Sequence, residues 1–319
     1  MTEAGADALA RLGWTAFFED QLIEGDAALQ PARIDAVHRG RLSALTPAGK
    51  IGIELPVNTG TADFAVGDWV LADPETGLFA HRLERKTLLQ RPSEGRRPTQ
   101  LVAANVDTLF IVASCNADFN LARLERYLTL ANDAGTDPVI VLTKADVSDD
   151  PADYAQQARA LQRGLAVVTL NARAPDAATA LADWCGPGAT VALVGSSGVG
   201  KSTLVNTLIG EEWQETGAIR ASDARGRHTT TARSLHAMPG GGWVIDTPGI
   251  RSLHLKDVEG GLDVLFAEIT ELAPMCKFRN CSHEHEPGCA VLKAVAAGTL
   301  DPERLKRWKK LQTESRGGR

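Results

Sequence analysis

Hydrophobic positions follow different patterns in successive parts of the chain. Between residues 30 and 90, an alternation of polar and apolar positions at 32–37 and short apolar runs such as 51–55 and 68–72 are separated by turns rich in glycine and proline. Short strands at this spacing are typical of a small β-barrel or sandwich, and the pattern leaves both open.

A second pattern begins near residue 100. Continuous apolar runs lie at 109–113, 139–142, 166–170 and 191–194, and amphipathic stretches at 121–134 and 152–163 and a short helix ending at Trp184 separate them. Apolar strands that alternate with helices predict an α/β domain with a parallel sheet covered on both faces. After about residue 255 the pattern becomes helical around a group of cysteines and histidines.

Composition agrees with a multidomain globular protein. The 319 residues are 44% hydrophobic and 23% charged, which favours two or three domains. No apolar run approaches the roughly 18–20 residues needed to cross a bilayer. The first ten residues lack a signal-peptide pattern, so we expect a cytoplasmic protein. The odd number of cysteines argues against a disulfide framework, and we interpret Cys115 and Cys185 as buried packing thiols.

The net charge of −6 hides an uneven distribution. Acidic residues dominate up to Gln30, whereas residues 82–97 and 301–319 are locally basic. Because a polyanion responds to local charge, the total does not exclude a nucleic-acid partner. The basic C-terminal segment permits two interpretations, RNA contact or packing with a solvated face, and it carries Arg304, Lys306, Arg307, Lys309 and Lys310.

A complete phosphate-binding motif follows the apolar strand at 190–194. It consists of Gly195, Ser196, Ser197, Gly198, Val199, Gly200, Lys201 and Ser202, with Thr203 next in the helix that it opens. The glycines let backbone N–H groups surround phosphates, and the helix N-terminus adds positive potential. Lys201 would reach the β- and γ-phosphates, and Ser202 would bind Mg²⁺.

Two further segments fit a γ-phosphate site. Asp246 ends the strand at 243–245, and an Asp there can hold Mg²⁺ while Gly249 donates a backbone N–H to the γ-phosphate. The polar loop at 217–233 can order around the metal and phosphate. We expect Thr230 to complete the magnesium shell, with Thr229 and Thr231 as alternatives.

A base-recognition element precedes the phosphate loop. Thr143, Lys144, Ala145 and Asp146 follow the strand at 139–142. The Asp146 carboxylate can accept two hydrogen bonds from guanine, which adenine cannot supply, and Asn171 and Ala172 end the next strand near the expected base. Thr143 stands where N-K-x-D elements have Asn, and a hydroxyl replaces only part of an amide's hydrogen bonding. The order of the two motifs predicts a circularly permuted GTPase domain.

Three cysteines and two histidines lie close together near the C-terminus. Cys276, Cys281 and Cys289 with His283 or His285 can form a Cys₃His shell for structural zinc. A reducing cytoplasm disfavours disulfides among these thiols.

These motifs, in this order, resemble those of the bacterial ribosome small-subunit-dependent GTPases of the RsgA, or YjeQ, type. The resemblance covers nearly the whole chain, and its C-x4-C-x-H-x5-C pattern selects His283 as the fourth zinc ligand. It implies an OB-like β-barrel at 1–95, a permuted GTPase at 96–255 and a helical zinc domain at 256–319. It also implies a monomer that hydrolyses GTP on the 30S subunit during late maturation, contacts rRNA and leaves after hydrolysis, and it favours RNA contact by the C-terminal helix.

Hydrolysis needs a group that orients the attacking water. Many GTPases place Gln after the D-x-x-G element, but this chain has Ile250 there, so slow intrinsic turnover is expected. His228 is the best internal candidate, with a solvent- or RNA-facing role as the alternative. Arg225 and Arg227 can meet either transition-state charge or RNA phosphate. Two other functions stay open: an RNA-binding scaffold gated by nucleotide, and an ATPase, against which Asp146 argues.

Overall fold

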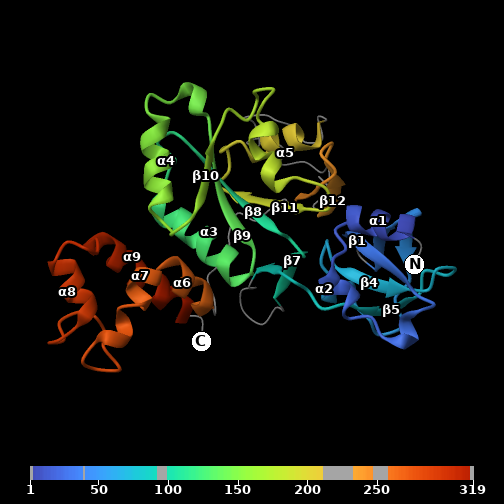
Figure 1. Cartoon of the computed structure of the whole chain (residues 1–319), viewed down its shortest axis with the longest axis horizontal. Coiled ribbons are helices and arrows are strands. Elements are labelled where there is room, and N and C mark those ends of the chain that lie inside the picture. The colour runs from blue at the N-terminus through green and yellow to red at the C-terminus, as the bar shows by residue number, and fades with distance from the viewer. Residues whose placement is uncertain (1–2, 39, 92–98, 211–232, 247–257, 317–319) are drawn as a thin grey trace, which may run out of the picture.

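A computed structural model describes residues 3–38, 40–91, 99–210, 233–246 and 258–316. The N-terminal strands, the central sheet with its helices and the C-terminal helices form three successive groups along the chain (Figure 1). His228, Thr230, Gly249 and Ile250 lie outside the described residues. Among those that are described, none of the helices combines the length and apolar character that crossing a bilayer requires.

The N-terminal group is a five-stranded antiparallel sheet that curls on itself. Its strands are β1 (Gln30–His38), β2 (Arg41–Thr46), β3 (Gly49–Ile53), β4 (Trp69–Ala72) and β5 (Phe79–Arg82), in the order β3-β2-β1-β4-β5. An isolated parallel bridge between Glu54 and Leu78 brings the two edges together. Alternate residues of β1 and β2, such as Ile34 and Leu42, fill an apolar interior. Two short helices, α1 (Glu3–Arg11) and α2 (Ala16–Glu19), precede it and pack a second apolar cluster against Trp69.

The central group is the predicted parallel sheet. Its strands are β8 (Thr108–Ser114), β9 (Asp137–Thr143), β10 (Ala166–Thr169), β11 (Thr190–Gly195) and β13 (Trp243–Asp246), in the order β10-β9-β8-β11-β13. Every neighbouring pair in this series is parallel. Separate apolar clusters lie on the two faces, one under α3 (Leu121–Asp133) and α4 (Pro151–Arg159), the other under α5 (Lys201–Ile209). The continuous apolar runs arise because these strands are buried on both faces.

One additional strand joins the first two groups. β12 (Ser234–Ala237) runs antiparallel to β13 and meets β1 at the pair Ala36 and Ser234. The Trp243 indole Nε1 also donates to the Arg11 carbonyl at 2.7 Å. The N-terminal sheet is therefore attached directly to the edge of the central sheet.

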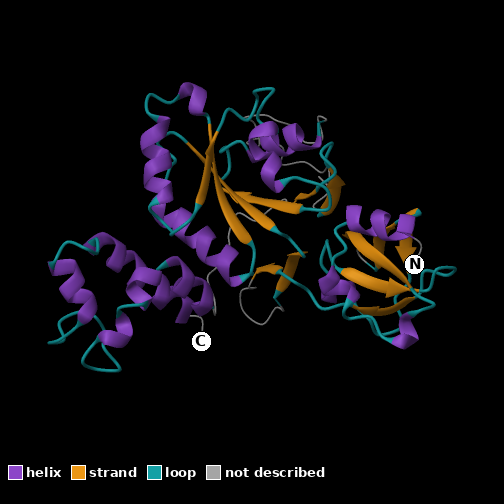
Figure 2. Ribbon diagram, viewed as in Figure 1, coloured by secondary structure: helices purple, strands orange, loops and turns teal. Residues whose placement is uncertain are grey.

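A hairpin lies where the two groups meet in sequence. β6 (Leu88–Arg91) and β7 (Gln100–Ala104) pair as an antiparallel two-stranded sheet, seen beside the central sheet in Figure 2. The predicted boundary at residue 95 lies in sequence between these two strands, outside the described residues.

The C-terminal group is helical, as predicted. It contains α6 (Glu259–Leu265), α7 (Ala267–Thr270), α8 (Ala290–Ala296) and α9 (Pro302–Arg316). α6 packs closely on α3 at Gly261, where a Cβ atom would lie 2.1 Å from the Thr129 carbonyl oxygen. Only glycine allows this approach of the two helices.

Two predicted helices differ in detail. The helix expected at 152–163 ends at Arg159, because the chain then turns so that Leu161 and Leu165 become buried. The short helix before Trp184 is a 3₁₀ helix, Thr179–Trp184.

Candidate nucleotide and metal sites

The phosphate motif forms the predicted strand–loop–helix unit. β11 ends at Gly195 and α5 begins at Lys201. Gly195 has φ +144°, and a Cβ atom there would lie 2.2 Å from the Val112 carbonyl oxygen, so a larger residue cannot pass β8 here. Gly198 and Gly200 also have positive φ, and α5 starts without a side-chain cap. The loop's N–H groups and the helix N-terminus therefore provide an anion-binding arrangement.

Lys201 folds back over the loop. Its Nζ donates to the Ser196 carbonyl. This contact holds the ammonium group at the loop, where a bound phosphate would attract it.

Thr143 connects the base-recognition element to the phosphate loop. Its buried hydroxyl lies 2.5 Å from the Val199 carbonyl and 3.1 Å from the Ala113 carbonyl. A hydroxyl has one proton, so it donates to one of these carbonyls at a time. Thr143 acts on the loop backbone, and this reduces the hydroxyl's capacity to contact a base.

The other residues predicted to border the base lie just beyond the ends of β9 and β10. Asp146 is exposed on a 3₁₀ turn just beyond β9, and Lys144 adopts a left-handed conformation with φ +58° that makes this turn. Asn171 lies past β10, where its Oδ1 accepts from the Arg173 backbone N–H at 3.0 Å. The Ala172 carbonyl accepts from the Thr207 hydroxyl of α5 at 2.7 Å.

Parallel pairing brings these segments to one edge of the sheet. Ser114 pairs with Thr143, and Gly195 with Val112, so β8, β9 and β11 end at nearly the same level. Asp246 ends β13, the neighbour of β11, and its backbone pairs with Ser234. Ser202 lies in the first turn of α5. The carboxyl ends of parallel strands are the usual ligand-binding edge of α/β sheets.

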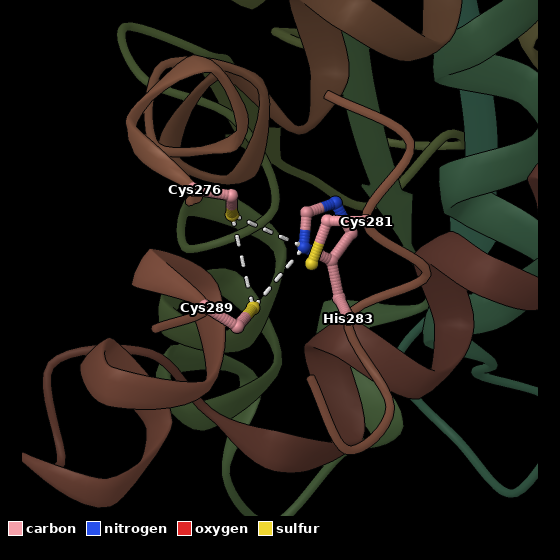
Figure 3. A group of neighbouring side chains, drawn as sticks. All are labelled: Cys276, Cys281, His283 and Cys289. Carbon is pink, nitrogen blue, oxygen red and sulfur yellow. Dashed lines mark hydrogen bonds between the residues drawn. The ribbon is translucent and has the colours of Figure 1, made fainter. Parts of the chain in front are cut away.

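The four predicted zinc ligands gather in one cluster. The ligand atoms of Cys276, Cys281, His283 and Cys289 all lie within 4.8 Å of one another, and their side chains point together (Figure 3). Cys276 Sγ lies 3.8 Å from Cys289 Sγ and 3.6 Å from His283 Nδ1. A tetrahedral zinc ion with Zn–S bonds of about 2.3 Å would separate two sulfurs by about 3.8 Å. His285 is not a member of the group.

Backbone and side-chain contacts support this cluster. The Ala290 and Leu292 N–H groups donate to Cys276 Sγ and Cys289 Sγ, each at 3.4 Å. The Glu286 carboxylate accepts from the Ser282 hydroxyl and N–H, which closes the loop around His283 and lowers the pKa of Glu286. Burial, with Lys309 nearby, lowers the pKa of His283 and favours the neutral imidazole that a metal requires.

The other two cysteines are buried away from the cluster. Burial raises the pKa of Cys115, and it raises the pKa of Cys185 to about 12. Both thiols therefore stay protonated near neutral pH, as expected for packing residues.

Two basic residues of the C-terminal helix pack inside the protein, so they are not available for RNA contact. The Arg304 guanidinium is buried: it donates to Glu125 at 2.9 Å, to Glu268 at 2.6 Å, and to the Leu161 and Leu265 carbonyls. Arg307 donates to both Glu125 oxygens at 2.9 Å.

Other basic residues of α9 divide between support and solvent. Lys309 donates to the His283 carbonyl at 2.7 Å. Lys306 and Lys310 are exposed, so RNA contact by these two stays a prediction. Arg304 lies on the same buried face of α9 as Leu305, Trp308 and Leu311. Its side chain therefore meets Glu125 of α3 and not solvent.

Sequence reasoning also missed Arg123. Its Nη1 donates to the Ser196 hydroxyl at 2.6 Å, although the two residues are 73 positions apart. The only local signal is Asn120, a helix-capping residue that places Arg123 in the first turn of α3.

The comparisons with known proteins agree with this geometry. The model of the RsgA GTPase family matches residues 82–256. A small ribosomal subunit biogenesis GTPase RsgA from Mesorhizobium japonicum is 65% identical over 98% of this chain and 91% of its own length. A second such protein, from Vibrio vulnificus, is 48% identical over 98% of this chain and 90% of its own length.

Solved structures give the same result. YjeQ from Thermotoga maritima matches with a TM-score of 0.67 at 25% identity, covering 91% of this chain and all of that one. YloQ, described as a circularly permuted GTPase, matches with a TM-score of 0.66 at 25% identity, covering 93% and 99%. The base-recognition element precedes the phosphate loop in the chain and lies beside it in the sheet, as in a circularly permuted GTPase. Together with the match to the family model and the 65% identity to a curated relative, this shows that the protein belongs to the RsgA GTPase family.

Proposed function

We propose that this protein is a cytoplasmic GTPase of small ribosomal subunit biogenesis. It would bind GTP, act on the 30S subunit during late maturation and leave after hydrolysis. The observation that carries the proposal is the meeting of the phosphate loop and the base-recognition element at one sheet edge, in a chain that is 65% identical to a protein named for this role. The scaffold alternative has no observation that favours it.

The nucleotide would lie along the edge formed by β9, β11 and β13. The loop at 195–200 and the start of α5 would hold the phosphates by backbone N–H groups, with Lys201 between the β- and γ-phosphates. Asp146 would accept hydrogen bonds from guanine, and Lys144, Ala145, Asn171 and Ala172 would border the base. Gly249 would contact the γ-phosphate.

Magnesium would be held by Ser202, Thr230 and Asp246. This set of hydroxyl and carboxylate oxygens is the type that Mg²⁺ prefers. When bound, the ion would neutralise charge that develops on the phosphates. The chain's own contribution to hydrolysis would be His228, which would orient the attacking water.

We assign a structural role to the Cys₃His cluster, with one zinc ion. Its closed ligand set leaves no open position for substrate, which is typical of structural zinc. We further propose that the N-terminal sheet is an OB-like barrel, since its strand order and the parallel Glu54–Leu78 bridge are typical of that fold. Residues 1–95, 96–255 and 256–319 would be the domains of a monomer that contacts rRNA.

Two variants test the proposed site. Lys201→Ala should weaken GTP binding, measured with a fluorescent GTP analogue. In the wild type, ATP should fail to displace that analogue. His228→Ala should bind GTP normally and lose most of the turnover stimulated by small subunits. GTP binding that is unaffected by Lys201→Ala, or equal competition by ATP, would contradict the nucleotide assignment, and unchanged stimulated turnover would contradict the role of His228.

A further inference from the structure

Two cationic side chains converge on the residue that begins the phosphate loop. Lys201 donates to the Ser196 carbonyl, and Arg123 of α3 donates from Nη1 to the Ser196 hydroxyl at 2.6 Å. Lys201 belongs to the phosphate motif, whereas Arg123 lies in α3, the helix that connects β8 to β9. The loop is thus held at its start from two directions.

Arg123 differs from the other arginines that contact α3, each of which pairs with a carboxylate. Arg126, three residues further along α3, pairs with Glu314 at 2.6 Å, and Arg304 and Arg307 share Glu125. Within the part of the chain that the structure describes, no carboxylate forms an ion pair with Arg123. Its positive charge beside the phosphate loop is therefore not neutralised by a salt bridge among those residues.

The position of Arg123 is built into the helix. The Asn120 side chain caps α3 by accepting from the Arg123 backbone N–H at 2.9 Å. Glu125, two positions later, is fully buried and bonded to Arg304 and Arg307. α3 is therefore anchored on both sides of Arg123, and the guanidinium extends from a fixed backbone toward a loop whose glycines allow many conformations.

We propose that Arg123 is a positioning residue for nucleotide binding. It fixes the start of the phosphate loop through Ser196 and adds positive potential where the nucleotide phosphates would lie. The inference rests on the proposed nucleotide site. Because the bond to Ser196 joins two side chains of the protein and touches no reacting atom, it should assist ground-state and transition-state binding equally, and its loss should raise KM and leave kcat nearly unchanged.

The test is a double-mutant cycle between Arg123 and Ser196. For each variant it measures KM and kcat for GTP in subunit-stimulated turnover, and Kd for GDP. Arg123→Ala should raise KM and Kd by about tenfold, the loss of one hydrogen bond to a charged group, with kcat within about twofold. Arg123→Lys should recover part of the affinity because it keeps the charge. Ser196→Ala added to Arg123→Ala should cost nothing more, since both changes remove the same contact.

Arg126→Ala is the matched control, since it lies on the same helix and faces Glu314. It should leave KM unchanged, and urea unfolding should show that Arg123→Ala folds normally. Wild-type KM in Arg123→Ala, fully additive effects of the two substitutions, or a loss confined to kcat would each overturn the inference. Lys201→Ala separates the two proposals. If it loses GDP binding while Arg123→Ala keeps it, only the role of Arg123 fails, and if it binds normally, the nucleotide site itself fails.

Discussion

At the scale of single residues, the base-recognition element divides its work between two side chains. Thr143 is buried and bonded to the phosphate loop, and Asp146 is exposed beyond the strand. The hydroxyl at 143 therefore ties the two segments together, and we expect discrimination between bases to fall on Asp146.

Asp146→Asn should change the preferred base. Guanine presents N–H donors that need the carboxylate, whereas xanthine replaces the exocyclic amine with a carbonyl that an amide can donate to. GTP affinity should fall by about 100-fold, the loss of charge-assisted hydrogen bonds, while xanthosine triphosphate should bind better than to the wild type. Competition binding with both nucleotides measures this, and unchanged GTP preference would contradict the role of Asp146.

The five thiols should also behave differently from one another. With metal bound, few should react with a thiol reagent, because Cys115 and Cys185 are buried with raised pKa values and the other three would be ligands. Removal of metal by a chelator should expose Cys276, Cys281 and Cys289 together, with release of one zinc ion per chain. Native protein that contains no stoichiometric zinc, or reaction at Cys185 before the cluster, would contradict the assignment.

Among the helices and strands, the docking of α9 on α3 depends on charge as well as apolar contact. Glu125 is fully buried between Arg304 and Arg307, and Arg304 also caps the carbonyls of Leu161 and Leu265. Such a network is costly to break, because the remaining charge stays buried without a partner.

Glu125→Gln should therefore destabilise the protein by about 3 kcal/mol or more. The matched control is Arg163→Ala, which removes an exposed pair with Glu271 and should cost about 1 kcal/mol or less. Urea denaturation followed by circular dichroism compares the two free energies of unfolding. Equal, small losses in both variants would show that the buried network does not hold α9 in place.

The elements that sequence patterns predicted are those whose signals are local. Continuous apolar runs identified β8, β9, β10 and β11, and the phosphate motif located α5 at its observed start. The pairing of β12 with β1 and the burial of Arg304 depend on contacts between segments that are far apart in the sequence. The charge of α9 left RNA contact and packing both open, because a sequence does not reveal which arginines meet a buried glutamate.

At the scale of the whole molecule, the nucleotide edge is connected to both flanking groups of elements. β12 joins the edge of the central sheet to the N-terminal sheet through Ala36 and Ser234. α3 contacts the phosphate loop through Arg123 and the C-terminal helices through Glu125. In sequence, α6 is the next described helix after β13. We therefore expect a change at the nucleotide site to be felt by both flanking groups through these contacts.

GTP turnover with and without purified small ribosomal subunits tests the central claim most directly. With Ile250 after the γ-phosphate element, the isolated protein has no glutamine there to orient water, so its turnover should be slow. Addition of small subunits should raise the rate by about tenfold or more, which corresponds to about 1.4 kcal/mol or more of barrier lowering. A rate that stays flat as subunits are added would contradict a GTPase of small-subunit biogenesis.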